Sequence, residues 1–260
     1  MAKTLVVKLA GTVDNPDLRK LGELRFNIVP VGSLPPDKQY TPSGGTQDIQ
    51  LKTNRPILLE LTGSGHFTDE TLTQNLGTRV TTLGDVSTLQ TFYVSDSTST
   101  LHVYDKYAIN QIALPNTGRH YVWSFDFGEL EGITAMRSIY FHSAVYTAER
   151  SLDIVSRMPY LNWLVALTSG DESVQLKGDL SVLSELTGLL HINLDWQRKI
   201  TGNISSLAGL TYLRELHFEG LRNVTGDTSS LAHLHPNNGG QLATFVYRNS
   251  GITGEWPPSA

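Results

Sequence analysis

Apolar residues recur through the second half of the chain with one fixed spacing. Four consecutive units share internal steps of 3, 3, 3 and 2 residues, and their first positions lie 25, 28 and 24 residues apart. A period of this length predicts a solenoid, in which one unit buries its apolar edge only by stacking on the next. The units are Leu130, Ile133, Met136, Ile139, Phe141; Val155, Met158, Leu161, Leu164, Ala166; Leu183, Leu186, Leu189, Ile192, Leu194; and Leu207, Leu210, Leu213, Leu216, Phe218.

The pattern continues in both directions. A fifth unit, from Leu231 to Tyr247, keeps the same pattern apart from a five-residue insertion within 235–241. Upstream, the segment 107–114 keeps the last two steps, which predicts an additional strand at the N-terminal end of the solenoid, where such arrays need a cap. Downstream, we expect Trp256 to fold over the last coil.

The spacing also predicts local structure. The closing step of two residues is typical of a strand, because alternate side chains share one face. The steps of three residues favour a short turn of helix or 3₁₀ helix on the opposite side of each coil.

These units resemble the leucine-rich repeat family. The family's L-x-x-L-x-L core is readable as Leu189-x-x-Ile192-x-Leu194 and Leu213-x-x-Leu216-x-Phe218. The chain departs from the family where an Asn usually follows the strand, since the residues there are Ala144, Gln197 and Leu221. We expect recurring I/V-T-G-polar segments to satisfy the backbone groups that such an Asn would bind.

Those I/V-T-G-polar segments carry a second resemblance. They occur at 200–203, 224–227 and 252–255, and two are followed by Ser-Ser-Leu-Ala. They look like the repeats of gut Bacteroidota surface proteins and of the crAss-like phages that infect those bacteria. The resemblance implies a surface-displayed repeat protein.

The first hundred residues show short alternating strands without a helical period. Strands are predicted at 3–9, 22–29, 48–53, 56–62, 79–83, 89–94 and 100–104, with a long loop at 31–45. We therefore predict an α/β chain of high β content, in which an antiparallel β-sandwich or barrel-like domain precedes a solenoid with a parallel sheet. The predicted boundaries are 1–106 for a docking and oligomerisation domain and 107–260 for the repeats.

Bulk composition excludes several classes of function. A net charge of −5 disfavours nucleic acid as the main partner. The absence of cysteine excludes disulfides, thiolate metal sites and cysteine nucleophiles. No segment is apolar enough for a membrane span, and the N-terminus shows no export signal. We expect neither nucleic-acid binding nor membrane insertion.

The strand assignment places three columns of side chains on the concave sheet of the solenoid. The first is Ser138, Trp163, His191, Glu215, Thr244; the second is Tyr140, Val165, Asn193, His217, Val246; the third is His142, Leu167, Asp195, Glu219, Arg248. Trp163, Val165 and Leu167 are expected to form an apolar patch, and such patches usually mark interaction sites. The alternative is that this face is ordinary mixed surface or is covered by the N-terminal domain. The predicted partner-binding residues are Tyr140, His142, Trp163, Val165, Leu167, His191, Asn193, Asp195, Glu215, His217, Glu219 and Arg248.

The sequence supports a catalytic or metal site less well than a partner-binding face. His191, His217 and Asp195 stand on neighbouring strands, but strand columns bring polar residues together in any solenoid, and a metal site needs convergent, supported ligands. The segment Gly63-Ser64-Gly65-His66 lacks the ending of a phosphate-binding loop. We predict no catalytic residue, no metal site and no cofactor.

The preferred function is therefore a non-enzymatic structural and protein-binding protein. The resemblance implies a phage virion surface component, such as a head fibre or capsid decoration protein. It would be made in the host cytosol and would contact other virion subunits or a host surface protein or glycan, and we expect a homo-oligomer. Two alternatives stand: a bacterial leucine-rich repeat adhesin or scaffold at the cell surface, and a carbohydrate-binding protein acting through Trp123 or Tyr104.

Overall fold

The computed structural model describes most of the second half of the chain and many strands of the first half. The described residues are 5–8, 27–30, 38–40, 47–54, 57–62, 67–68, 75–77, 80–83, 90–94, 100–103, 106–114, 123–146, 148–168 and 175–257.

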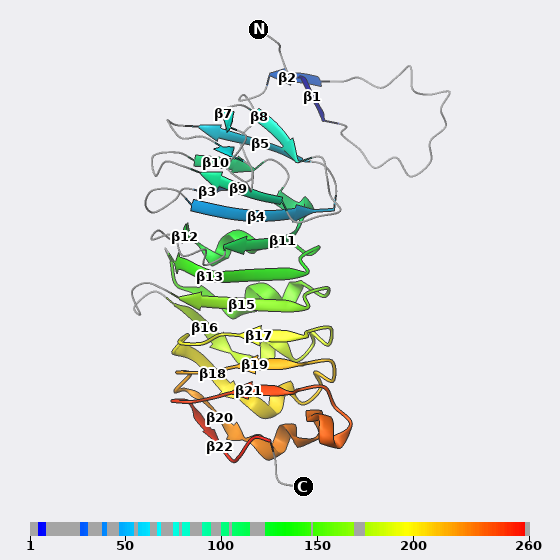
Figure 1. Ribbon diagram of the computed structural model, residues 1–260, viewed down its shortest axis with the longest axis vertical. Coiled ribbons are helices and arrows are strands. Elements are labelled where there is room, and N and C mark those ends of the chain that lie inside the picture. The colour runs from blue at the N-terminus through cyan, green and yellow to red at the C-terminus, as the bar shows by residue number, and fades with distance from the viewer. Residues whose placement is uncertain are drawn as a thin grey trace, which may run out of the picture.

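The predicted solenoid is present as a parallel sheet with one strand from each coil (Figure 1). Neighbouring strands pair in parallel from the predicted extra strand to the fifth unit. In spatial order they are β11 (Ile109–Leu114), β13 (Ser138–Tyr146), β15 (Trp163–Thr168), β17 (His191–Asn193), β19 (Glu215–His217) and β21 (Thr244–Val246). A short strand, β12 (Trp123–Phe125), also pairs in parallel with β13.

The spacing identified the core correctly. All twenty positions of the four regular units are at most 2% exposed. In the fifth unit Phe245 is 7% exposed, and Trp256 packs edge-on against its ring at 5.6 Å. Trp256 therefore covers the last coil, as expected.

A second parallel sheet lies on the other side of each coil and was not predicted. Its strands are β14 (Arg150–Ser151), β16 (Leu176–Asp179), β18 (Lys199–Asn203), β20 (Val224–Asp227) and β22 (Gly251–Thr253). Three of them contain the I/V-T-G segments or their beginning. This main-chain pairing is the structural role of those segments.

Short 3₁₀ helices precede strands of the main sheet, and four of them directly follow strands of the second sheet. They are η3 (Phe127–Leu130), η4 (Leu152–Arg157), η5 (Leu180–Leu183), η6 (Ile204–Leu207) and η7 (Thr228–Leu234), with η8 (Pro236–Asn238) in the predicted insertion and η2 (Lys106–Ala108) before β11. All helical segments within the described residues are 3₁₀ helices, so the helical part of the predicted α/β class takes this tighter form.

In the two I/V-T-G-polar segments that a helix follows, the polar residue caps that helix. Asn203 Oδ1 accepts the Ser205 N–H at 2.9 Å, and Asp227 Oδ1 accepts the Ser229 N–H at 3.0 Å. The preceding glycine is required because Gly226 has φ 119°, and a Cβ there would lie 2.5 Å from Asn203 Oδ1 of the previous coil.

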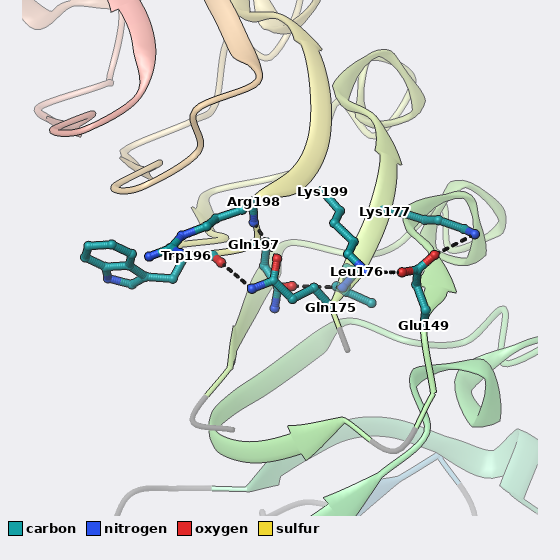
Figure 2. A network of polar contacts seen from close by, with 8 residues as sticks. All are labelled: Glu149, Gln175, Leu176, Lys177, Trp196, Gln197, Arg198 and Lys199. Atoms are coloured by element: carbon teal, nitrogen blue, oxygen red, sulfur yellow. Dashed lines mark hydrogen bonds and ion pairs between the residues drawn. The ribbon is translucent and has the colours of Figure 1, made fainter. Parts of the chain in front are cut away.

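The missing asparagine has a different replacement from the one expected. Gln197 is fully buried, and its Nε2 donates to the Ala166 carbonyl at 2.7 Å. Its Oε1 accepts the Leu176 N–H at 2.9 Å (Figure 2). Gln175 makes an equivalent pair of bonds to the backbone of Trp196 and Arg198. Gln197, at the position of that Asn, and Gln175 therefore bond to backbone groups of neighbouring coils. The I/V-T-G-polar segments satisfy other backbone groups through their pairing in the second sheet.

The main sheet continues into the first half of the chain. β4 (Gln47–Thr53) pairs antiparallel with β11 and with β9 (Gln90–Val94), so the sheet crosses the predicted boundary at 106/107. The sheet then extends to β6 (Phe67–Thr68) and β7 (Asn75–Gly77). That boundary stays a prediction.

Other strands of the first half also pair antiparallel. One group has the order β3 (Lys38–Tyr40), β10 (Thr100–Val103), β5 (Ile57–Thr62) and β8 (Val80–Leu83), and β1 (Leu5–Lys8) pairs with β2 (Asn27–Pro30). Most predicted strands coincide with these, and β3 falls within the predicted loop 31–45.

Candidate binding surface

The first two predicted columns are present on the outer face of the main sheet. Main-chain pairing places Ser138, Trp163, His191, Glu215 and Thr244 side by side, and the same register aligns Tyr140, Val165, Asn193, His217 and Val246. We call the outward side chains of these two columns, with Asp195, Glu219 and Arg248, the main-sheet face.

Three aromatic rings stack along this face. The Trp163 and His191 rings lie 4.4 Å apart and are inclined by only 3°, and His191 and His217 lie 5.7 Å apart at 26°. Parallel strands about 4.8 Å apart hold equivalent side chains at this distance. The stack is therefore a direct consequence of the register.

Glu215 joins the two histidines. Its Oε2 is 3.0 Å from His191 Nδ1 and 3.9 Å from His217 Nε2. Burial lowers the pKa of His191, with an opposite contribution from Glu215 and a further lowering from His217. His191 is thus held mainly in its neutral form at pH 7, where it stacks on Trp163.

The third column is regular only in its later coils. Asp195 Oδ1 accepts the Glu219 N–H at 2.6 Å, which joins neighbouring coils at this position. Burial raises the pKa of Asp195, and the Glu219 charge adds to this rise. At β13 the register shifts between Phe141 and Ala144, so the column does not continue evenly to position 142. The His142 side chain lies outside the described residues.

The expected apolar patch is interrupted. Trp163 and Leu167 are half-buried, but Val165 is only 2% exposed and His191 only 8%. Val165 has a short side chain between Tyr140 and Asn193 on the neighbouring strands, which leaves it little free surface. Val165 and His191 therefore pack against their neighbours on this face and leave little surface for a partner to contact.

One aromatic residue beside this face was missed. Trp196 directly follows Asp195, is 38% exposed, and lies under the Arg198 guanidinium, which is 5.3 Å from its ring centroid. The sequence contains one indication of this residue, since a glycine, Gly220, stands at the equivalent position of the next coil. A Cβ at Gly220 would lie 2.6 Å from the Trp196 ring, so the large ring needs a glycine beside it.

Other candidates fall outside this surface. The segment 63–66 and Tyr104 lie outside the described residues, as does the Trp123 side chain. Within the part of the chain that the structure describes, no group of three or more His, Asp or Glu side chains could hold a metal ion. None of the described helical segments is long and apolar enough to cross a bilayer.

Comparison with known proteins adds little. No known family profile matches the sequence, and no curated protein matches it. Among solved structures, internalin C2 from Listeria monocytogenes is similar with 13% identity and a TM-score of 0.30, over 63% of this chain and 81% of that chain. A similarity this low carries no functional argument. The repeat pairing and the buried apolar columns themselves describe a parallel solenoid of stacked coils.

Proposed function

We propose that this protein is a non-enzymatic binding protein that recognises another protein through its main-sheet face. The observation that carries this proposal is the register of five parallel strands, which aligns outward side chains that differ from coil to coil. Tyr140 and Trp163 belong to residue types that are enriched at protein interfaces.

The charge of the main-sheet face indicates the chemistry of the partner. Glu215 stands in the first column, and Asp195 and Glu219 stand in the third column on neighbouring coils. Arg248 is the one Lys or Arg among the residues that define this face. Asp195 is also partly buried beside Glu219, so a cation from a partner would relieve their repulsion. A basic segment on the partner fits this arrangement.

We also propose that the protein is displayed on a phage virion, as a head fibre or capsid decoration protein. The support is the resemblance of its I/V-T-G-polar segments to surface repeats of that kind. In this proposal residues 1–106 dock on other virion subunits and form a homo-oligomer, while the solenoid points outward.

The test compares two charge reversals that change the net charge equally. Phage particles carrying Glu215→Lys with Glu219→Lys are compared, for adsorption to host cells, with particles carrying Asp153→Lys with Glu185→Lys, two exposed acids near the 3₁₀ helices. We expect the first pair to lower adsorption at least tenfold and the second pair to leave it unchanged. Equal adsorption of particles with either pair would exclude the main-sheet face as the binding site.

The virion location has its own measurement. Immunogold labelling of purified particles with antibody against the solenoid should decorate the capsid or its fibres. Particles that remain unlabelled, although the protein is expressed in infected cells, would contradict the proposed location without bearing on the binding face.

A further inference from the structure

Exposed tyrosines gather on one edge of the solenoid, beside the main-sheet face. Among the described residues, the exposed large apolar side chains are Tyr107 (51%), Tyr160 (59%), Tyr212 (57%) and Trp196 (38%). The three tyrosines all precede a main-sheet strand, whereas Trp196 follows one. They therefore stand on the edge where the chain enters the main sheet, and Trp196 stands where it leaves.

A backbone ladder fixes the relative positions of these tyrosines. Along this edge N–H groups donate to carbonyls of the preceding coil, from Arg137 to Asn110 at 2.7 Å, from Asn162 to Arg137 at 2.9 Å, and onward through Leu190 and Arg214 at 2.8 Å each. Tyr160 and Tyr212 each precede a ladder residue by two positions, and Tyr107 precedes Asn110 by three. The tyrosines thus occur on every second coil, with about 10 Å between their backbones because adjacent strands are about 4.8 Å apart.

The coils between them carry small residues. Gly188 occupies the position between Tyr160 and Tyr212, and Ala135 occupies the equivalent position one coil before Tyr160. The backbone does not require glycine at 188, because its φ is not positive and an added Cβ would meet only the Leu161 carbonyl at 3.8 Å. The missing side chain leaves the space beside both rings open.

The edge is also cationic, although the whole chain is acidic. Arg137 lies 5.4 Å from the centroid of the Tyr160 ring, and Arg214 stands two residues after Tyr212 and donates to Gln241. Both arginines are exposed, and the ladder residues from 110 to 214 include no acid. The two guanidinium groups therefore offer pairing positions to an anionic ligand, and the exposed acids of the same turns, Glu131 and Glu185, lie off the ladder.

We propose that the tyrosine edge, defined as Tyr107, Tyr160, Tyr212, Arg137 and Arg214, binds an extended acidic oligosaccharide along the solenoid axis. The C–H faces of sugar rings pack on the exposed tyrosine rings, and carboxylates of the sugar pair with the two guanidinium groups. This site shares no residue with the proposed protein-binding face, although it adjoins that face where Arg137 and Arg214 precede Ser138 and Glu215.

Two other kinds of partner, a protein and a single-stranded nucleic acid, fit this edge less well. A protein hot spot needs aromatic anchors inside a desolvated core, whereas the neighbours here are the exposed Pro159, Thr187 and Thr211. Proteins that bind single-stranded nucleic acid combine stacking rings with a positively charged groove along the backbone, whereas this edge carries two arginines on a chain of net charge −5.

The test is an NMR titration of the full chain labelled with ¹³C at the tyrosine rings. The probes are tetragalacturonic acid and 3′-sialyllactose, with maltotetraose and lactose as neutral counterparts and a single-stranded oligothymidine as the nucleic-acid rival. We expect an acidic saccharide to shift the Tyr160 and Tyr212 signals and to bind at least tenfold more tightly than its neutral counterpart.

Variants then locate the site. Tyr160→Ala, Tyr212→Ala and Gly188→Leu, which fills the space between the rings, should each weaken that binding at least fivefold, and Trp196→Ala on the opposite edge should not. Arg137→Gln should reduce the preference for the acidic saccharide over the neutral one. Absence of binding to both acidic probes at millimolar concentration, equal binding of neutral saccharides, tighter binding of oligothymidine, or an equal loss in Trp196→Ala would overturn the proposal.

Discussion

The two parallel sheets of the solenoid are built alike but differ in how much their side chains vary. The first outward column of the main sheet holds five different residue types on five coils, Ser138, Trp163, His191, Glu215 and Thr244. The second sheet repeats Thr-Gly-polar on its last three coils. Where side chains bond to the adjacent coil, the structure dictates their identity; where they face outward, they are free to serve recognition.

The contacts of the second sheet explain its uniformity. Thr253 Oγ1 donates to Asp227 Oδ2 at 3.0 Å, and Asp227 itself caps the helix η7. Asp227 therefore serves its own coil and the next one. Changes in the second sheet should reduce stability, and matched changes elsewhere should not.

The largest effect is expected at Gly226. Substitution Gly226→Val places a side chain at φ 119° and against Asn203 Oδ1, and we expect the free energy of unfolding to fall by about 3 kcal/mol or more. Urea denaturation measures it. Gly209→Val is the matched control, because an added Cβ at 209 meets nothing within 4 Å. A similar loss in both variants would contradict the steric explanation.

Removal of the Gln197 side chain should have the next largest effect. Gln197→Ala leaves the Ala166 carbonyl and the Leu176 N–H without their buried partner, at a cost of about 2–4 kcal/mol. Hydrogen exchange should show a faster rate at the Leu176 amide. The control is Gln241→Ala, because Gln241 is exposed and bonds only to Arg214 in the described contacts; this change should alter stability little. An unchanged exchange rate at the Leu176 amide in Gln197→Ala would refute the proposed role of Gln197 in bonding to the backbone.

A smaller effect is expected at a helix cap. Asn203→Ala removes the acceptor for the Ser205 N–H and should lower stability by about 1 kcal/mol. Asn203→Asp keeps an acceptor and should retain most of the stability. Thermal unfolding of the two variants separates capping from a general effect of substitution, since only the capping explanation predicts a difference between them.

The smallest effect is an electrostatic one at Glu149. Hydrogen bonds from Lys177 and then Lys199 lower the pKa of Glu149 from 4.5 to about 2 (Figure 2). Because the folded-state pKa is depressed, its contribution to stability is present above about pH 4.5 and is lost as the pH falls toward 2.

The comparison for this prediction is Glu149→Gln. Its melting temperature should lie slightly below that of the unaltered chain at pH 6 and should approach it near pH 2. Added salt should also narrow the difference, because the Glu149 side chain is 33% exposed. A difference that is independent of pH would assign the effect of Glu149 to packing instead.

Much of the solenoid could be predicted because its core depends on spacing. A repeated step places Leu216 and Phe218 inward regardless of what surrounds them, and both are fully buried. The function of Gln197 could not be predicted, because its partners Ala166 and Leu176 are distant in sequence and become neighbours only through coil stacking. The sequence predicted which residues of the binding surface stand side by side, but it did not predict how exposed each one is. Val165 was expected on the surface and is only 2% exposed.

The sequence by itself determined the number of coils, the buried apolar column and the alignment of strands, because a fixed spacing allows only one way to bury every apolar residue. Only the tertiary structure decided that a second sheet forms, that His191 stacks on Trp163, and that tyrosines from alternate coils share one edge. Those features depend on which side chain stands on the neighbouring coil, roughly 25 residues away in a repeat of this kind.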